Sequence, residues 1–216
     1  MKSLLILSLL VSFGCANPVE KAVNKVKYSA WETVGVEKRD LFKKEVGHVK
    51  DEQEDTQEAF KDALTQLKEI YGFNGGDLEH EQKKLANAYD DAAEQAQEVH
   101  ERIENVDRIA NDLFDEWEDE MDEIKTKDLR HKSGEQLSET KKKYSDLRKK
   151  LVKSEKRIGP VLDRLHDQVL FLKHNLNARA ITGLKVEGAK IETDIGKLMK
   201  DMEASNKEAD AFIKTL

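Results

Sequence analysis

Proline, cysteine and aromatic residues are scarce in this chain. Its 216 residues include two prolines and one cysteine, and aromatic side chains make up 6% of the total. Low aromatic and glycine contents argue against a β-sandwich, and two prolines are too few for a proline-rich disordered chain. The mean hydropathy of −0.73 argues against a protein with several membrane spans. Long helices are the structure that remains.

Motifs for nucleotide and metal chemistry are also missing. The sequence contains no GxxxxGK[ST] phosphate loop, no GxGxxG, no HExxH and no CxxC. Glu45 and His48 have the spacing of a di-iron helix bundle, but that site needs a second Glu-x-x-His, which is absent. The acidic stretch 115–123 is more typical of a solvated helix face than of a cation site. We therefore expect no enzyme activity, no catalytic residue, no cofactor and no metal site.

The first 14 residues have the composition of a signal peptide. Lys2 precedes an apolar run at residues 4–13, which is shorter than the roughly 20 residues that a spanning helix needs. Cys15 follows directly, and as the sole cysteine it cannot form an internal disulfide. Ser12-Phe13-Gly14-Cys15 resembles the lipobox of bacterial lipoproteins. We predict acylation of Cys15, with an ordinary signal peptide cut nearby as the alternative.

An acylated Cys15 would place the protein in the cell envelope. Several acyl chains hold a protein on a membrane much more firmly than one. Ala16, rather than Asp, follows the cysteine and resembles sorting to the outer membrane. We expect a lipid anchor at the periplasmic face of that membrane, a helical stalk at residues 15–35, and a bundle domain at residues 36–216.

Apolar residues then recur every seven positions. From residue 78, one series steps by seven from Leu78 to Leu113 and a second from Tyr89 to Ile124. Similar series occupy residues 42–70, 137–172 and 184–212. A sustained seven-residue period makes helices wind around a partner with left-handed supercoiling. Gln53 and Thr56 interrupt the earliest series, and we expect weaker pairing there.

Turn residues divide these series. Gly75 and Gly76 can end a helix in the left-handed conformation, and Asp77 can cap the next one, which predicts a tight antiparallel turn. The seam breaks near residue 130, and Ser133-Gly134-Glu135-Gln136 matches a capping box, so we expect a helix to begin there.

Two further positions could interrupt the last half of the chain. The heptad series passes Gly159-Pro160 without a change of phase, which predicts a kink within one helix. We place the last turn at residues 174–177. The predicted fold is all-α: an elongated antiparallel coiled-coil bundle of about four long helices.

Charge is unevenly distributed along the chain. Residues 90–123 carry fifteen acidic and two basic side chains, whereas residues 141–157 carry nine basic and two acidic ones. Opposite charges beside apolar seams select partner helices. The second and third helices are therefore expected to pack together, within one molecule or across a dimer, unless the two faces are independently solvated.

The basic run is a candidate surface for anionic partners. It includes Lys141, Lys142, Lys143, Arg148, Lys149 and Lys150. Lipid headgroups, lipopolysaccharide phosphates or the acidic helix of the same protein suit an exported chain better than nucleic acid does. We expect no nucleic-acid or nucleotide partner.

Residues 167–181 differ in texture from the repeats around them. Four consecutive apolar residues at 169–172 exceed what a heptad stripe needs, so we expect burial on several sides. A central packing knot of the bundle is favoured, and a polar network or partner surface is the alternative. That surface would comprise Phe171, Lys173, His174, Asn175, Asn177 and Arg179.

Four stretches together resemble a known bacterial family. Residues 34–40 (VGVEKRD), 73–79 (FNGGDLE), 113–118 (LFDEWE) and 167–181 are similar to the family called domain of unknown function 2959. The resemblance implies a proteobacterial protein, often with a lipoprotein-like signal and with no established activity. Some members carry a DNA-repair ATPase label, which the missing phosphate loop and the export signal argue against.

These observations lead to one expected function and its alternatives. We expect an outer-membrane-anchored periplasmic scaffold or adaptor that associates with envelope proteins or with itself. A chaperone-like binding module, whose apolar stripe holds unfolded chains, is the alternative. A DNA-associated protein is the least favoured.

Overall fold

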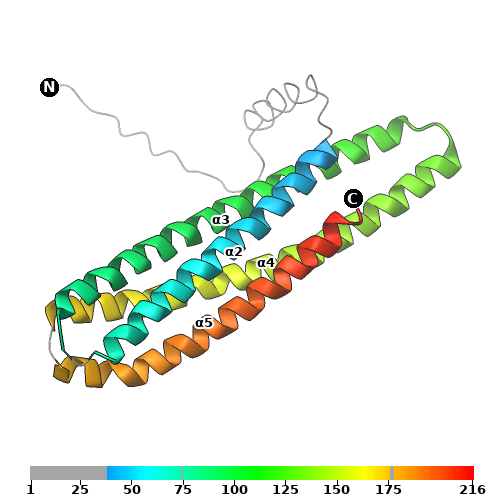
Figure 1. Cartoon of the computed structure of the whole chain (residues 1–216). Helices are drawn as coiled ribbons and strands as arrows, with labels where there is room; N and C mark the ends of the chain where they lie inside the picture. The colour runs from blue at the N-terminus through cyan, green and yellow to red at the C-terminus, as the bar shows by residue number, and fades with distance from the viewer. Residues whose placement is uncertain (1–37, 74, 176–177) are drawn as a thin grey trace, which may run out of the picture. The chain divides into compact units, whose positions relative to one another are not determined.

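The protein's structure, a computed structural model, describes residues 38–73, 75–175 and 178–216. This part of the chain contains four helices and no strand: α2 (Lys38–Tyr71), α3 (Leu78–Glu123), α4 (Lys127–His174) and α5 (Ala178–Ile213) (Figure 1). The all-α prediction is confirmed. The predicted signal peptide, Cys15 and the stalk lie outside the described residues. Among the described helices, none is long and apolar enough to cross a membrane.

The four helices form an antiparallel bundle in which each helix has two neighbours. Ion pairs connect α2 to α3, α3 to α4, α4 to α5, and α5 back to α2, so α2 lies diagonally across from α4. In that order the pairs are Glu52–Arg102 (3.2 Å), Asp107–Arg148 (2.8 Å), Lys153–Asp201 (2.7 Å) and Asp210–Lys50 (3.1 Å). This is the up-down-up-down arrangement that short connections between long helices favour.

The heptad positions form the core. All nine expected positions of α2 are buried, including Gln53 and Thr56, and so are all six of α4 from Leu137 to Leu172. The series of α5 from Leu184 to Phe212 is buried as well. In α3 seven of the twelve expected positions are buried, and the other five are partly exposed: Leu78, Tyr89, Ala96, Trp117 and Ile124. The seven-residue period therefore identified the inward face of α2, α4 and α5, and most of that of α3.

An aromatic layer closes one end of the core. Phe42, Phe114, Tyr144 and Phe212 come one from each helix, and their ring centroids lie 5.4 to 6.2 Å apart. Most of the ring pairs meet edge to face, the geometry that aromatic quadrupoles prefer. This layer ties all four helices together at the end of the bundle where α2 begins and α5 ends.

The turn between α2 and α3 has the predicted chemistry. Gly75 and Gly76 have φ angles of 134° and 124°, which side chains with a Cβ rarely adopt. The Asp77 carboxylate accepts a hydrogen bond from the backbone N–H of His80 at 3.1 Å and so caps α3.

The predicted helix start at the capping box is wrong. α4 already begins at Lys127, and Ser133 lies inside it, where its hydroxyl accepts a hydrogen bond from the indole N–H of Trp117 at 2.8 Å. The apolar seam breaks here because α2 and α5 no longer cover the α3–α4 hairpin. The helices continue without a core to face.

The last turn and the continuity of α4 agree with the sequence, and the kink expected at Gly159-Pro160 stays a prediction. α4 runs through Gly159 and Pro160 without ending, as the unbroken heptad phase indicated. α4 ends at His174 and α5 begins at Ala178, so the last turn falls where it was predicted.

Candidate functional site

The α3–α4 hairpin extends beyond the ends of α2 and α5 (Figure 1). The Arg39 guanidinium lies 5.2 Å from the Trp117 ring centroid, and Leu216 lines a hollow together with Trp117 and Gln136. The first residue of the bundle and its last therefore both lie beside this level of the hairpin. Residues 118–135 continue past it as a two-helix projection, which we call the arm.

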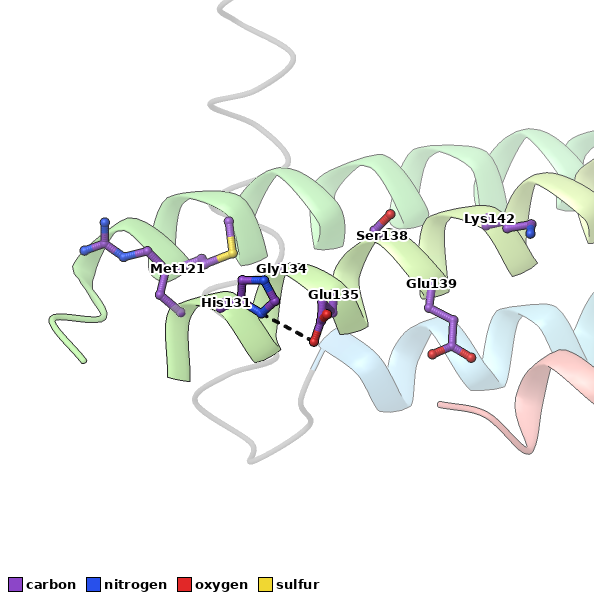
Figure 2. A pocket seen from close by; sticks show the side chains of 8 residues that line it. Met121, His131, Gly134, Glu135, Ser138, Glu139 and Lys142 are labelled. Atoms are coloured by element: carbon purple, nitrogen blue, oxygen red, sulfur yellow. Dashed lines mark ion pairs between the residues drawn. The ribbon is translucent and has the colours of Figure 1, made fainter. Parts of the chain in front are cut away.

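A shallow hollow lies along the α4 side of the arm. Its volume is about 600 Å³. Figure 2 shows Met121 reaching over from α3, while the other labelled side chains come from α4. A Cβ at Gly134 would lie 3.4 Å from the sulfur of Met121, so the missing side chain leaves room for the thioether against α4. The residues around the hollow are Met121, Arg130, His131, Gly134, Glu135, Ser138, Glu139 and Lys142.

Charge within the arm is segregated by position. Five carboxylates lie on the last turns of α3: Glu118, Asp119, Glu120, Asp122 and Glu123. The loop and the first turns of α4 are basic, with Lys125, Lys127, Arg130 and Lys132. Arg130 donates from its guanidinium to the carbonyl of Ile124 at 2.7 and 2.9 Å, which satisfies an acceptor at the end of α3. We call residues 124–132 the tip.

Most cations of the predicted anionic-partner patch form ion pairs with carboxylates of the same molecule. Five of its six cations form ion pairs, and the sixth, Lys142, lines the hollow. The pairs are Lys141–Glu118, Lys143–Glu139, Arg148–Asp107, Lys149–Asp146 and Lys150–Glu208. The expected contact between the acidic and basic helices is confirmed within one molecule. Exposed ion pairs of this kind contribute little stability each, about 0–1 kcal/mol, but the three that join two helices favour α3 and α5 as the neighbours of α4.

The basic face of α4 also pairs with α5, which the sequence analysis missed. Lys150, Arg157 and Arg164 recur every seven residues and meet carboxylates of α5 that recur at the same interval. The pairs are Lys150–Glu208, Arg157–Asp201 and Arg164–Asp194. Matching seven-residue charge series on two segments were the signal that could have indicated this contact.

Asp201 is the most enclosed carboxylate of this series. Its side chain is 13% exposed. Burial opposes its ionisation, but hydrogen bonds from Lys153 and Arg157 outweigh that cost and lower the pKa of Asp201. The interhelical pair is thus held in its charged form by the fold.

A layer of polar side chains crosses the middle of the core. The Gln53 amide donates to the Ser154 hydroxyl at 3.0 Å, and its carbonyl accepts from the Ser205 hydroxyl. Thr56 donates to the carbonyl of Glu52 at 2.7 Å. These four side chains are fully buried. Because a buried polar group must find a partner, the layer fixes how α2, α4 and α5 are aligned.

His100 lies beside this layer at the α3–α4 boundary. Its Nδ1 is 2.5 Å from Glu155 of α4, and its Nε2 is 3.4 Å from Glu104 on its own helix. The hydrogen bond to Glu155 raises the pKa of His100. In the described ranges, this place included, no group of three or more metal-ligating side chains converges. The chemistry available here is hydrogen bonding and charge pairing.

The end of α4 is more exposed than expected. Leu170 and Phe171 are 41% and 43% exposed, so the prediction of burial on several sides is wrong. Two of the four consecutive apolar residues, Val169 and Leu172, face the core, and the other two lie on the opposite side of the helix. The four-residue run therefore follows ordinary helical periodicity.

The polar residues of that segment do not form a network in the described part. Lys173 and His174 are exposed, and Asn175 donates to the carbonyl of Phe171 at 2.9 Å, which caps α4. Arg179 lies in the first turn of α5, and Asn177 lies outside the described residues.

Comparison with known proteins gives a single positive result. A family model described as "Protein of unknown function (DUF2959)" matches residues 27–216. No curated protein and no solved structure matches the chain.

Proposed function

Because the chain belongs to the DUF2959 family, to which no activity is attached, we propose a structural role: an envelope scaffold or adaptor. The protein would be anchored by an acylated Cys15 at the periplasmic face of the outer membrane. Its bundle would present the arm as the element that contacts a partner. No catalytic step is part of this proposal.

The scaffold role rests on the contrast between the buried faces of the bundle and the uncovered arm. The heptad faces of the four helices are buried against one another, whereas the arm continues past the bundle without α2 or α5 to cover it. A rigid body with one projecting element suits a protein that positions a contact. The ion-pair series between α4 and α5 and the polar layer of the core fix how these helices are aligned.

The anchor rests on the sequence alone. The short apolar run at residues 4–13 followed by Cys15 is the feature that supports it. Two or more acyl chains would hold the protein on the membrane stably, whereas one chain gives only reversible binding.

Intact-mass analysis of the full-length protein purified from membranes tests the anchor. We expect a mass that corresponds to cleavage before an acylated Cys15. A Cys15→Ala variant should lose both the acyl mass and the membrane association in fractionation. An unprocessed, non-acylated protein in the soluble fraction would remove the anchor from the proposal.

A chaperone-like module would need an apolar surface open in the native state. In the described ranges, the exposed large hydrophobic side chains are Leu129, Leu170, Phe171 and Val186. They lie at the tip, at the end of α4 and on α5, not along one stripe. We expect little binding of an apolar dye to the native protein and a single cooperative unfolding transition. Strong dye binding before unfolding would favour the chaperone alternative.

A further inference from the structure

The tip concentrates cations that the bundle does not neutralise. Residues 124–132 include four Lys or Arg side chains and one carboxylate, Asp128. Within the part of the chain that the structure describes, Lys125, Lys127 and Lys132 form no ion pair, in contrast to most of the cations farther along α4. Arg130 donates to backbone carbonyls, so its charge also remains without a carboxylate partner.

An exposed leucine lies among these cations. Leu129 is in the first turn of α4 and is 56% exposed. The partly exposed Ile124 and Met121 lie close behind it in sequence. An exposed apolar side chain with cations on both sides in the sequence suits the boundary of an anionic lipid layer, where acyl chains lie just beneath negative headgroups.

The carboxylates behind the tip would orient the arm. The five acidic residues of the last α3 turns make the arm positive at its end and negative along its side. A negative surface attracts the tip and repels the side, so the arm would approach end-on. At physiological salt, charges act over about 8 Å, so a surface in contact with the tip meets its four cations together with Asp122, Glu123 and Asp128, while the carboxylates farther back act weakly.

The bundle also begins at this end. Arg39, the first residue of the bundle unit, lies at the base of the arm beside Trp117. The segment that carries the proposed anchor therefore joins the bundle at the end from which the arm projects.

We propose that the tip of the arm binds anionic phospholipid headgroups through Lys125, Lys127, Arg130 and Lys132, with Leu129 entering the lipid boundary. The inference rests on the proposed envelope location for the membrane that the tip would meet. The contact itself needs no acylation.

A fluorescent label on the tip tests the contact directly. Cys15→Ala removes the sole natural thiol from the full chain, so Leu129→Cys can carry an environment-sensitive fluorophore at the tip. With vesicles containing phosphatidylglycerol we expect a blue shift and a rise in emission, and a return to the free spectrum at high salt. Val186→Cys in the same background, at a position 67% exposed on α5, is the matched label and should not respond.

Charge variants separate the tip from overall electrostatics. Replacing Lys125, Lys127 and Lys132 together with Gln in the labelled chain should weaken the vesicle response on the order of 100-fold, since each lysine near such a surface is worth roughly fivefold in affinity. Lys61, Lys185 and Lys200 are exposed elsewhere on the bundle, and their replacement with Gln gives the same net charge. This second variant should bind almost like the parent.

The outcomes of these experiments decide whether the tip binds anionic lipid. Equal weakening by the two triple variants, a response at residue 129 to neutral phosphatidylcholine vesicles, or no response at all would overturn the proposal. A shift at residue 129 that needs protein concentration but no vesicles would also overturn it, in favour of arm-to-arm self-association. Because the label reports without acylation, a failed tip and a failed anchor are distinguished.

Discussion

Gly188 should be the least replaceable glycine of α5. It is buried, and the ring of Tyr71, the last residue of α2, lies directly over it. A Cβ at Gly188 would come closer than 3.0 Å to two ring carbons and the hydroxyl oxygen of Tyr71, so the ring must move. The Tyr71 hydroxyl donates to the Gln168 carbonyl at 3.2 Å, and displacement of the ring would break that bond.

The expected cost of Gly188→Ala follows from three opposing contributions. Alanine is favoured over glycine in a helix by about 1 kcal/mol. Forcing a methyl group into a filled contact costs about 1–3 kcal/mol. Leaving Gln168, which is 5% exposed, without its partner costs about 1 kcal/mol more. The free energy of unfolding should fall by about 1–3 kcal/mol, or about 2–4 °C in Tm for each kcal/mol.

Urea unfolding followed by circular dichroism measures this difference, with an unchanged m-value as the sign that only stability has changed. Gly196→Ala is the matched control, because it lies in the same helix with no atom within 4 Å of its Cβ position. The control should stabilise the bundle by about 0.5–1 kcal/mol.

A double-mutant cycle isolates the contact. In a Tyr71→Ala background the ring is gone, and Gly188→Ala should then stabilise the protein as Gly196→Ala does. If Gly188→Ala stabilises the wild-type protein as much as the control, the ring contact does not restrict this position and the reasoning is refuted.

Two further predictions concern the middle of the bundle. The hydrogen bond to Glu155 raises the pKa of His100 above 6.5. The contribution of protonated His100 to the free energy of unfolding is therefore complete below pH 6.5 and is lost as the pH rises through the raised pKa. Urea unfolding from about pH 5 to about pH 9 should show a loss of stability above pH 6.5 that His100→Gln abolishes; an identical pH profile in the variant would contradict this. Gln53→Ala should lower the free energy of unfolding by about 2–4 kcal/mol, because it opens a cavity and leaves the hydroxyls of Ser154 and Ser205 without their shared partner. Gln53→Leu keeps the side-chain volume, so it should lower the free energy of unfolding by less in the same urea assay. An equal or greater decrease would show that the cavity does not account for the effect of Gln53→Ala.

The inward faces of the helices could be predicted because helical periodicity is a local property. A residue seven positions along a helix returns to nearly the same face, so the series from Phe42 to Ile70 and from Leu137 to Leu172 marked buried positions without any knowledge of the partners. The turn at Gly75-Gly76 was equally local, since the required φ angles belong to those residues alone.

The candidate site could not be predicted in the same way. The basic run drew attention as a surface for partners, yet Lys150 meets Glu208, 58 residues away, within the bundle. In the described ranges the tip's four cations have no carboxylate partner, and no pattern in the sequence distinguishes them from the paired ones. They lie where α2 and α5 have already ended and offer the hairpin no carboxylates.

The sequence by itself determined that the chain forms long helices, where two of the three turns that it marked fall, and which face of α2, α4 and α5 turns inward. Tertiary structure decided which charges meet, why Ser133 lies within α4 instead of beginning a helix, and why Gly188 must be small. The physical reason is the range of the interactions. Backbone hydrogen bonding and seven-residue spacing act within a few turns, whereas ion pairs, coverage of a seam and the space beside a glycine depend on which helix the fold brings alongside.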